Sequence, residues 1–403
     1  MNLTKLTLGA ALLSGVAGTA FADGHAKELH FIMCGGEVRE ADQAVVDQFI
    51  ADNEGVTVNL EAVPWGTCQD KSLTLAAAGD PPSIAYMGSR TLRQLANNDL
   101  IVPANIPEDA PYQPGVLNTV TIEGTTWGYP HAFSTKALYI NCDLVEESGQ
   151  ECVAPTTWDE MFTMAQGVVD NTDAAGVGLA GKDFDNTMHQ FLNYLYSNGG
   201  VVIDPATGEN KLDSQQTRET LEFYGRLASV AQEGPTAWER DQLKDLFNDG
   251  KIAMYVQGPW GYGQHNEDIN QLVAPVPAGP SGESGSILIT DSIVVFKGSG
   301  NEELAQELAQ RITSGDAQYD LDSSWGLTPI FDYSAMGKDD LYYEAGVWPN
   351  FTASISTGGP EPIVEDFKSL QSVFTNMVQG ILLEDDTVDN LVTIAGEELD
   401  DAL

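Results

Sequence analysis

Apolar residues recur with two different periods near the beginning of the chain. Continuous apolar runs at residues 28–33, 56–64 and 83–88 predict buried strands. Residues 42–53 and 71–79 lie between these runs and carry apolar side chains at helical spacing, which predicts two helices. Strands that alternate with helices in this way are typical of a parallel sheet covered by helices. We therefore predict an α/β fold.

Ligands of such sheets bind beyond the carboxyl ends of the strands, so the segments that follow the three predicted strands are candidates for a binding site. We expect these segments, residues 34–40, 64–70 and 87–93, to be loops. The side chains in them that are suited to contact a ligand are Glu37, Trp65, Ser89 and Arg90.

A second block of elements begins near Thr135. Thr157 followed by Glu160 is the signature of a helix capping box. A chain of 403 residues is also longer than a domain with a single hydrophobic core usually is, which favours about two domains. The predicted strands of this block are residues 137–145, 251–258 and 286–296, and its predicted amphipathic helices are residues 156–169, 186–200 and 215–232.

The stretch GKIAMYVQGPWGYG, residues 250–263, places two large aromatic rings directly after a predicted strand. Trp260 and Tyr262 follow Gly258 and are interspersed with further glycines, which give the loop unusual backbone freedom. We predict that these rings contact a ligand. The alternative is that Trp260 fills a hydrophobic core.

Charge excludes two classes of partner. The chain has 60 Asp and Glu against 18 Lys and Arg, a formal net charge of -42. Nucleic acid and anionic membranes are therefore poor partners, because binding to phosphates needs clustered cations. The acidic residues are scattered along predicted helices, so we interpret them as a solvated surface suited to high ionic strength.

Residues 1–22 have the pattern of a secretory signal. Lys5 precedes a short apolar run rich in small residues, and Ala20 and Ala22 form a small-x-small cleavage site. The run is too short and too rich in small residues for a stable membrane span, although an N-terminal anchor is the alternative. We predict a mature protein exported to the periplasm.

Export changes how the cysteines are interpreted. Cys34, Cys68, Cys142 and Cys152 form no C-x-x-C motif and have no neighbouring His at metal-ligand spacing, so we predict no metal site. In an oxidising compartment disulfides are favoured. The spacing favours pairing Cys34 with Cys68 and Cys142 with Cys152, among three possible pairings.

Catalytic motifs are absent from the sequence. It contains no G-x-S-x-G, no P-loop and no H-E-x-x-H, and its five histidines do not cluster. We therefore predict neither an enzyme nor a cofactor. The rival class is a secreted glycoside-acting enzyme, because a pair of catalytic carboxylates has no sequence signature of its own.

Residues 128–166 carry a more specific signature. Tyr129-Pro130, the strand LYIN at residues 138–141 and the helix start PTTWDE at residues 155–160 resemble the extracellular solute-binding proteins of the maltose-binding type, which are the sugar receptors of ABC importers. GKIAMYVQGPW resembles a second element of that family, G-K-x-A-M-x-x-x-G-x-W. Cys142 departs from the family pattern, where Lys or another polar residue is usual.

The resemblance implies a type II periplasmic-binding-protein fold, in which two α/β lobes are joined by three hinge crossings and close on a ligand between them. We place the crossings at residues 131–136, 286–289 and 327–330. Lobe 1 would comprise residues 23–132 and 289–328, and lobe 2 residues 133–288 and 329–403. The implied partners are a small-molecule ligand and the membrane permease of an importer, and we expect the receptor to be a monomer.

The resemblance also places the aromatic residues around the cleft. Trp260 and Tyr262 form the floor of the second lobe, and Gly258 lets the backbone approach the ligand, because sugars stack their C–H faces on aromatic rings. Trp65 either caps the sugar from the opposite side or packs over the first disulfide. Trp325 is either a cleft wall or a hinge packing residue.

The polar candidates are fewer. His131 either donates to a hydroxyl or is structural, and Asp185 with Asn186 would hold neighbouring hydroxyls. An inward-facing Arg90 would indicate an acidic or sulfonated sugar, whereas an outward-facing one would be solvated. Residues that the resemblance places on the closing loops are Thr328, Gly358 and Gly359.

The ligand class is left open between a mono- or oligosaccharide and a non-sugar or anionic ligand, such as a sulfonated sugar, a glycerol phosphodiester or a polyamine. Cleft charge distinguishes them. A cationic ligand predicts aspartates beside Trp260, an anionic ligand predicts an inward Arg90, and a neutral sugar predicts amides and stacked rings.

Overall fold

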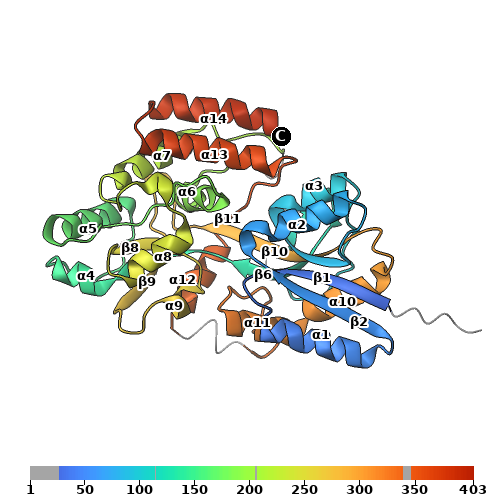
Figure 1. Ribbon diagram of the computed structural model, residues 1–403. Coiled ribbons are helices and arrows are strands. Elements are labelled where there is room, and N and C mark those ends of the chain that lie inside the picture. The colour runs from blue at the N-terminus through green and yellow to red at the C-terminus, as the bar shows by residue number, and fades with distance from the viewer. Residues whose placement is uncertain (1–26, 114, 205–206, 339–345) are drawn as a thin grey trace, which may run out of the picture.

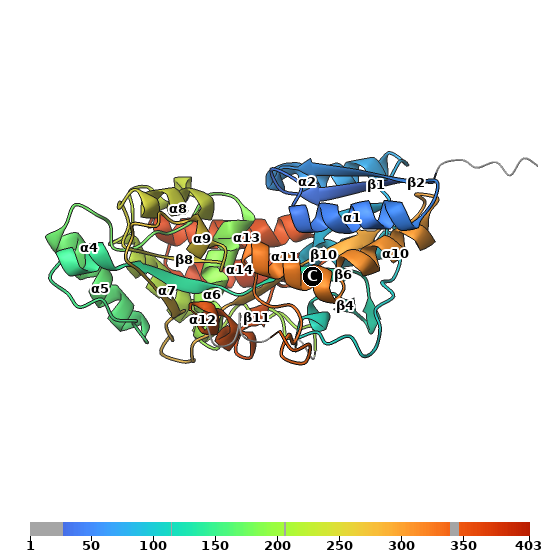
Figure 2. The same cartoon turned by 90° about the horizontal axis from the view of Figure 1, so that it is seen from below.

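The computed structural model describes residues 27–113, 115–204, 207–338 and 346–403. The predicted signal segment, residues 1–22, lies outside the described residues. Figure 1 shows two groups of elements with β6 and β10 between them. In the view turned by 90°, α4 and α5 lie at one end of the molecule and β1 and β2 at the other (Figure 2).

The first lobe is built on a mixed sheet. Strands β1 (Lys27–Cys34), β2 (Val56–Val63) and β3 (Ile84–Gly88) are parallel, as the apolar runs predicted. Strand β10 (Ile287–Val295) lies antiparallel to β3 and to β6 (Tyr129–Ser134). Figure 1 shows helices on both faces of this sheet. They are α1 (Glu40–Asp52), α2 (Trp65–Ala77), α3 (Leu92–Asn97), α10 (Glu302–Ile312) and α11 (Gly315–Trp325).

The second lobe has a smaller, antiparallel sheet. Its order is β8 (Met254–Gln257), β7 (Ala137–Asn141) and β9 (Gln271–Pro275). Thr157 caps α5 in a capping box with Glu160, as predicted. The helices around this sheet are α4 (Cys142–Glu147), α5 (Trp158–Asn171), α6 (Asp185–Ser197), α7 (Gln215–Ala228), α8 (Arg240–Asn248), α9 (Gly261–Gln264), α12 (Trp348–Thr352), α13 (Phe367–Leu382) and α14 (Val388–Ala402).

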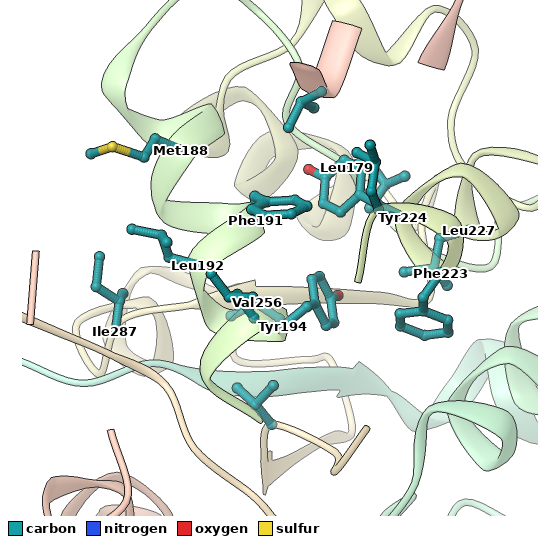
Figure 3. Close-up of a cluster of buried hydrophobic side chains, with 14 of the residues drawn as sticks. Leu179, Met188, Phe191, Leu192, Tyr194, Phe223, Tyr224, Leu227, Val256 and Ile287 are labelled. Carbon is teal, nitrogen blue, oxygen red and sulfur yellow. The ribbon is translucent and has the colours of Figure 1, made fainter. Parts of the chain in front are cut away.

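Each lobe has its own hydrophobic core. The core of the first lobe draws buried residues from 29–132 and 293–327, and that of the second lobe from 138–289 and 364–402. Figure 3 shows part of the second core, where Phe191 of α6 lies 6.0 Å from Tyr224 of α7, measured between ring centroids. The predicted lobe boundaries, 23–132 with 289–328 and 133–288 with 329–403, stay a prediction.

The chain passes between the lobes at neighbouring places. Ser134 at the end of β6 pairs with Ile289 of β10. The backbone N–H of Lys136 donates to Ser286 Oγ at 3.1 Å, and that of Thr135 donates to Thr328 Oγ1 at 3.1 Å. The three predicted crossings therefore lie side by side and are hydrogen-bonded to one another.

Both predicted disulfides are confirmed. Cys34 at the end of β1 is bonded to Cys68 in α2, with 5.4 Å between the Cα atoms. Cys142 is bonded to Cys152 with a Cα separation of 5.3 Å. The first bridge ties the carboxyl end of a sheet strand to a helix that borders the space between the lobes.

Three of the loop predictions were wrong. Residues 87–93 form the end of β3, the short helix η1 (Ser89–Thr91) and the start of α3. Residues 64–70 are not a loop, because α2 begins at Trp65 and the N–H groups of Thr67 and Cys68 donate to the carbonyl of Pro64. The segment after β8 also turns into a short helix, α9, instead of continuing as a loop. Within the described ranges, the helices are all too short or too polar to cross a membrane.

Candidate ligand-binding cleft

A cavity of about 670 Å³ lies between the two lobes. That volume is within the range of small-molecule binding sites, roughly 300–1,000 Å³. The first lobe contributes, among others, Trp65, Gln69, Tyr86, Arg90, Asp291 and Trp325, and the second contributes Lys136, Asp185, Asn186, His189, Arg240 and Trp260.

Aromatic rings form the wall on the first lobe. Trp65, at the start of α2, stacks with Trp325, at the end of α11, with 6.3 Å between centroids and 19° between planes. Tyr86 of β3 meets Trp65 edge-on at 5.3 Å. Arg39 places its guanidinium carbon 3.4 Å from the centroid of Trp325. Trp65 is 42% exposed, so part of its ring is free to contact a ligand.

Trp260 faces the cavity from the second lobe. Its ring folds back over Gly258 so closely that a Cβ at this glycine would lie 2.4 Å from a ring carbon. Tyr139 fixes the same turn, because its hydroxyl donates to the carbonyl of Gly258 at 2.9 Å. Glycine at position 258 therefore positions the Trp260 ring, and we expect no other residue to permit the same geometry.

Two cations lie beside the Trp260 ring. Lys136 Nζ is 4.7 Å from the ring centroid and Arg240 Cζ is 5.5 Å from it. Lys136 is buried and donates to Ser134 Oγ at 2.7 Å. Burial and the positive charge of Arg240 hold the pKa of Lys136 well below its ordinary value. Neither cation takes part in an ion pair with any other described residue.

A third cation, Arg90, is fully engaged by carboxylates. Its Nη2 lies 3.3 Å from Asp185, and its Nη1 lies 3.5 Å from Asp291 and 3.4 Å from Glu361. His189 Nε2 lies 2.6 Å from Glu361, which follows β11 (Gly359–Pro360). Arg90 belongs to the first lobe, whereas Asp185 and His189 belong to α6 of the second, so this cluster links the lobes.

The carboxylates of this cluster differ in acidity. Burial raises the pKa of Glu361, but Arg90 and His189 outweigh it and bring the pKa to about 2. Burial raises the pKa of Asp291 above its ordinary value in spite of Arg90. Asp291 also accepts a hydrogen bond from the hydroxyl of Tyr86 at 3.2 Å.

The structure brings six of the predicted site residues to the cavity. Gly258 does not line the cavity itself but lies under the Trp260 ring and positions it, as described above. Arg90 does point inward, but its charge is already neutralised by protein groups. The six are Trp65, Arg90, Asp185, Asn186, Trp260 and Trp325.

Four other candidates do not line this cavity. Glu37 is exposed in the turn after β1. Ser89 is buried and donates to the carbonyl of Thr290 at 2.5 Å. His131 is fully buried, with Nε2 3.1 Å from a carboxylate oxygen of Asp42. Tyr262 is 48% exposed and lines a second cavity of about 360 Å³.

The remaining candidates lie at or beside the predicted hinge crossings. Thr328 is buried and accepts the N–H of Thr135. Gly358 packs against the backbone of Ser286, and Gly359 packs against the ring of Tyr196. These residues hold the crossings together. Other protein atoms already fill the space beside Gly358 and Gly359 and contact the Thr328 hydroxyl.

Sequence reasoning missed several residues that line or border the cavity. A carboxylate inside an apolar strand, as in ILITDSIVV, is costly unless it is paired, and this would have identified Asp291. Lys136 lies between two apolar runs, so the same argument would have identified it. The other missed residues have no such sequence signal, because the residues that they contact are distant in the sequence. The missed residues are Tyr86, Lys136, His189, Arg240, Asp291 and Glu361.

Known proteins share the sequence pattern of this chain. The sequence model described as bacterial extracellular solute-binding protein matches residues 35–319. A binding protein of Brucella abortus (strain 2308) is 27% identical over 351 residues, which are 85% of this chain and 84% of that protein.

Solved structures share the fold. An ABC transporter solute-binding protein of Thermotoga lettingae TMO, bound with α-D-tagatose, has a TM-score of 0.82 at 23% identity and covers 93% of this chain and 99% of its own. Maltose-bound MalE3 of T. maritima has a TM-score of 0.80 at 23% identity, with the same coverage. The predicted type II periplasmic-binding-protein fold is confirmed.

Proposed function

The chain belongs to the bacterial extracellular solute-binding protein family, and we propose that it binds a mono- or oligosaccharide, or a sugar derivative, in the cleft between its lobes. In this proposal it delivers the bound solute to the membrane permease of an ABC importer. It returns the solute unaltered, because a receptor of this kind lowers no chemical barrier.

The observation that carries the proposal is the composition of the cavity wall. Three tryptophans, Trp65, Trp260 and Trp325, line one cavity together with amides and charged groups from both lobes. Indole faces offer apolar area to the C–H faces of a sugar ring, and the polar groups satisfy its hydroxyls. A purely apolar ligand would leave those polar groups unpaired, which is costly in a cavity.

Relatives support the same ligand class. The tagatose-bound and maltose-bound structures share the two-lobed fold. An arabinooligosaccharide-binding protein of Halalkalibacterium halodurans is 23% identical over 244 residues, 57% of this chain and 54% of that protein. The predicted signal segment and the solute-binding family are consistent with a periplasmic receptor that works beside a permease.

A ligand screen tests the proposal. The mature protein is heated in the presence of single mono- and oligosaccharides, sugar acids, sulfated sugars and polyamines. A ligand at one hundred times its Kd adds about 2.7 kcal/mol to the free energy of unfolding, so a true ligand raises Tm clearly. Binding at the cleft also changes intrinsic fluorescence, because three of the chain's seven tryptophans line it.

We expect at least one carbohydrate to raise Tm and to shift the fluorescence with saturable dose dependence. Silence across all carbohydrates, together with a clear response to polyamines, would contradict the proposal. Conversion of a sugar by the purified protein would contradict the receptor role.

A further inference from the structure

Cations are concentrated in the cleft of a strongly acidic protein. Five of the 18 Lys and Arg residues line the main cavity, against six of the 60 Asp and Glu residues. A cavity lined at random would contain many more acidic than basic side chains. The five cations are Arg90, Lys136, Lys182, Arg240 and Lys368, and the six acids are Asp70, Asp185, Glu239, Asp241, Asp291 and Asp366.

These cations differ in whether the protein supplies their counter-charge. Arg90 contacts three carboxylates, and Lys182 lies 3.5 Å from Glu239. Lys368 is exposed to solvent. Lys136 and Arg240 are beside Trp260 and have no carboxylate partner within the described ranges. They are therefore the sheltered cleft cations that form no ion pair with a described carboxylate, although Asp291 and Glu361 act on Lys136 from a longer distance.

The pair is unfavourable in the empty cleft. Lys136 is 1% exposed, so its ammonium has lost most of its hydration, and one serine hydroxyl replaces only part of it. Arg240 is half-buried, and its Nε has no hydrogen-bond partner. Two like charges beside one aromatic ring repel each other, and the ring face compensates them only in part.

We propose that the ligand carries an anionic group, such as a carboxylate, sulfate or phosphate, which Lys136 and Arg240 bind beside the ring of Trp260. This inference rests on the proposed function, because it adds a charge to the saccharide bound there. The sugar ring lies against the indole. The anion forms the ion pairs that no described carboxylate forms with Lys136 and Arg240. Arg240 offers a planar fork of N–H donors that matches such an anion, and Lys136 adds a point charge.

The other ligand classes fit this part of the cleft less well. A polyamine needs sheltered free carboxylates, but Asp185, Asp291 and Glu361 are engaged by Arg90. The cavity acids that form no ion pair with a described residue are exposed to solvent; they are Asp70, Asp241 and Asp366. A neutral sugar would bring no counter-charge to Lys136 and Arg240, which form no ion pair with a described carboxylate. The inward position of Arg90 is not itself evidence for an anionic ligand, because its charge is already satisfied.

The test compares each neutral sugar with its charged counterpart. Titration calorimetry of the mature protein uses glucose, glucuronate, glucose 6-sulfate and glucose 6-phosphate, and galactose with galacturonate. We expect one charged member to bind at least about tenfold more tightly than its neutral counterpart. Comparison of the titrations with the carboxylate, sulfate and phosphate sugars identifies which anion the protein prefers.

Two variants connect that preference to the residues. Arg240→Gln and Lys136→Met should each reduce affinity for the charged sugar about tenfold and affinity for its neutral counterpart by less, so that the preference for the charged sugar falls. Arg226→Gln is the matched control, because Arg226 also lies over an aromatic ring, 4.0 Å from the centroid of Phe162, but outside the cleft. Melting of each unliganded variant shows whether it is folded.

The outcomes separate this inference from the proposed function. Equal or tighter binding of the neutral sugars overturns the anionic group and leaves a saccharide receptor in place. A preference for charged sugars that survives in both folded variants overturns the role of Lys136 and Arg240. Absence of binding by every sugar, charged or neutral, overturns the proposed function and the inference with it.

Discussion

Arg90 and Arg240 line the same cleft in very different surroundings. Arg90 contacts Asp185, Asp291 and Glu361, whereas Arg240 lies beside the Trp260 ring and forms no ion pair with any described carboxylate. A cation whose counter-charges are supplied by protein holds the structure together. A sheltered cation without them is available to a ligand. The position of an arginine in a cleft is therefore a weaker guide to ligand charge than its partners are.

The difference also assigns separate tasks to the two regions. The Arg90 cluster joins η1 (Ser89–Thr91) of the first lobe to α6 of the second, so it stabilises this arrangement of the lobes. The Trp260 region presents a ring and two cations from one lobe to the cavity. Substitutions in the first region should change stability, and those in the second should change binding.

The largest expected effect is on folding. Arg90→Met leaves Asp291 and Glu361 buried without their cation, and breaking a buried ion pair costs about 3–5 kcal/mol. Arg240→Gln removes no ion pair and should change the free energy of unfolding by less than about 1 kcal/mol. Chemical denaturation measures both variants. Similar losses in the two would refute the distinction between paired and unpaired arginines.

Acid should weaken the Arg90 cluster next. The pKa of Glu361 is about 2 in the folded protein and 4.5 as its ordinary value. A carboxylate with a lowered folded pKa stabilises the protein above its unfolded pKa, and that contribution, about 3 kcal/mol, is lost as pH falls from about 4.5 to about 2. Denaturation across this window measures the slope. Glu361→Gln should have a shallower slope than wild type, and an unchanged slope would argue against the charge assignment.

Trp260→Ala should affect binding more than folding. Loss of stacking and apolar contact weakens ligand affinity by about 1–3 kcal/mol. The melting temperature of the unliganded protein should change little, because the ring borders a cavity. Trp238→Ala removes a tryptophan that does not line the cleft and serves as the control. A Trp260→Ala protein that unfolds yet keeps its affinity would make the ring a core residue.

The smallest expected effect has the opposite sign. Lys136→Met removes a buried cation and keeps most of the side-chain volume, so it should stabilise the unliganded protein by about 1 kcal/mol. Burial and Arg240 lower the pKa of Lys136, which means that its charged form destabilises the fold at neutral pH. Destabilisation of the unliganded variant would show that the ammonium contributes to folding.

Local patterns predicted most of the fold. The apolar runs located β1, β2 and β3, and the Thr157 capping box located the start of α5. Cysteine spacing in an exported chain supplied both disulfides. The hinge crossings and lobe boundaries that the resemblance implies stay a prediction. The main local error was α2, which begins at Trp65 because Pro64 starts a helix that looked like a loop.

The site was predicted less completely because its contacts span the chain. The sequence left the direction of Arg90 open, and its partner Glu361 is 271 positions away, so its neutralisation had no local signal. His131 and Ser89 have polar side chains near the cleft that other protein groups already engage. Lys136 and Arg240 can be recognised only from the fold, in which no described carboxylate forms an ion pair with them.

A crystal structure of the protein with the tightest-binding sugar tests the central claim most directly. We predict a sugar ring against the indole of Trp260, with an anionic group within hydrogen-bonding distance of Lys136 Nζ and the Arg240 guanidinium. The contacts of Arg90 with Asp185, Asp291 and Glu361 should persist. A ligand bound outside this cavity, or an anion held by Arg90 with Lys136 and Arg240 untouched, would contradict the account.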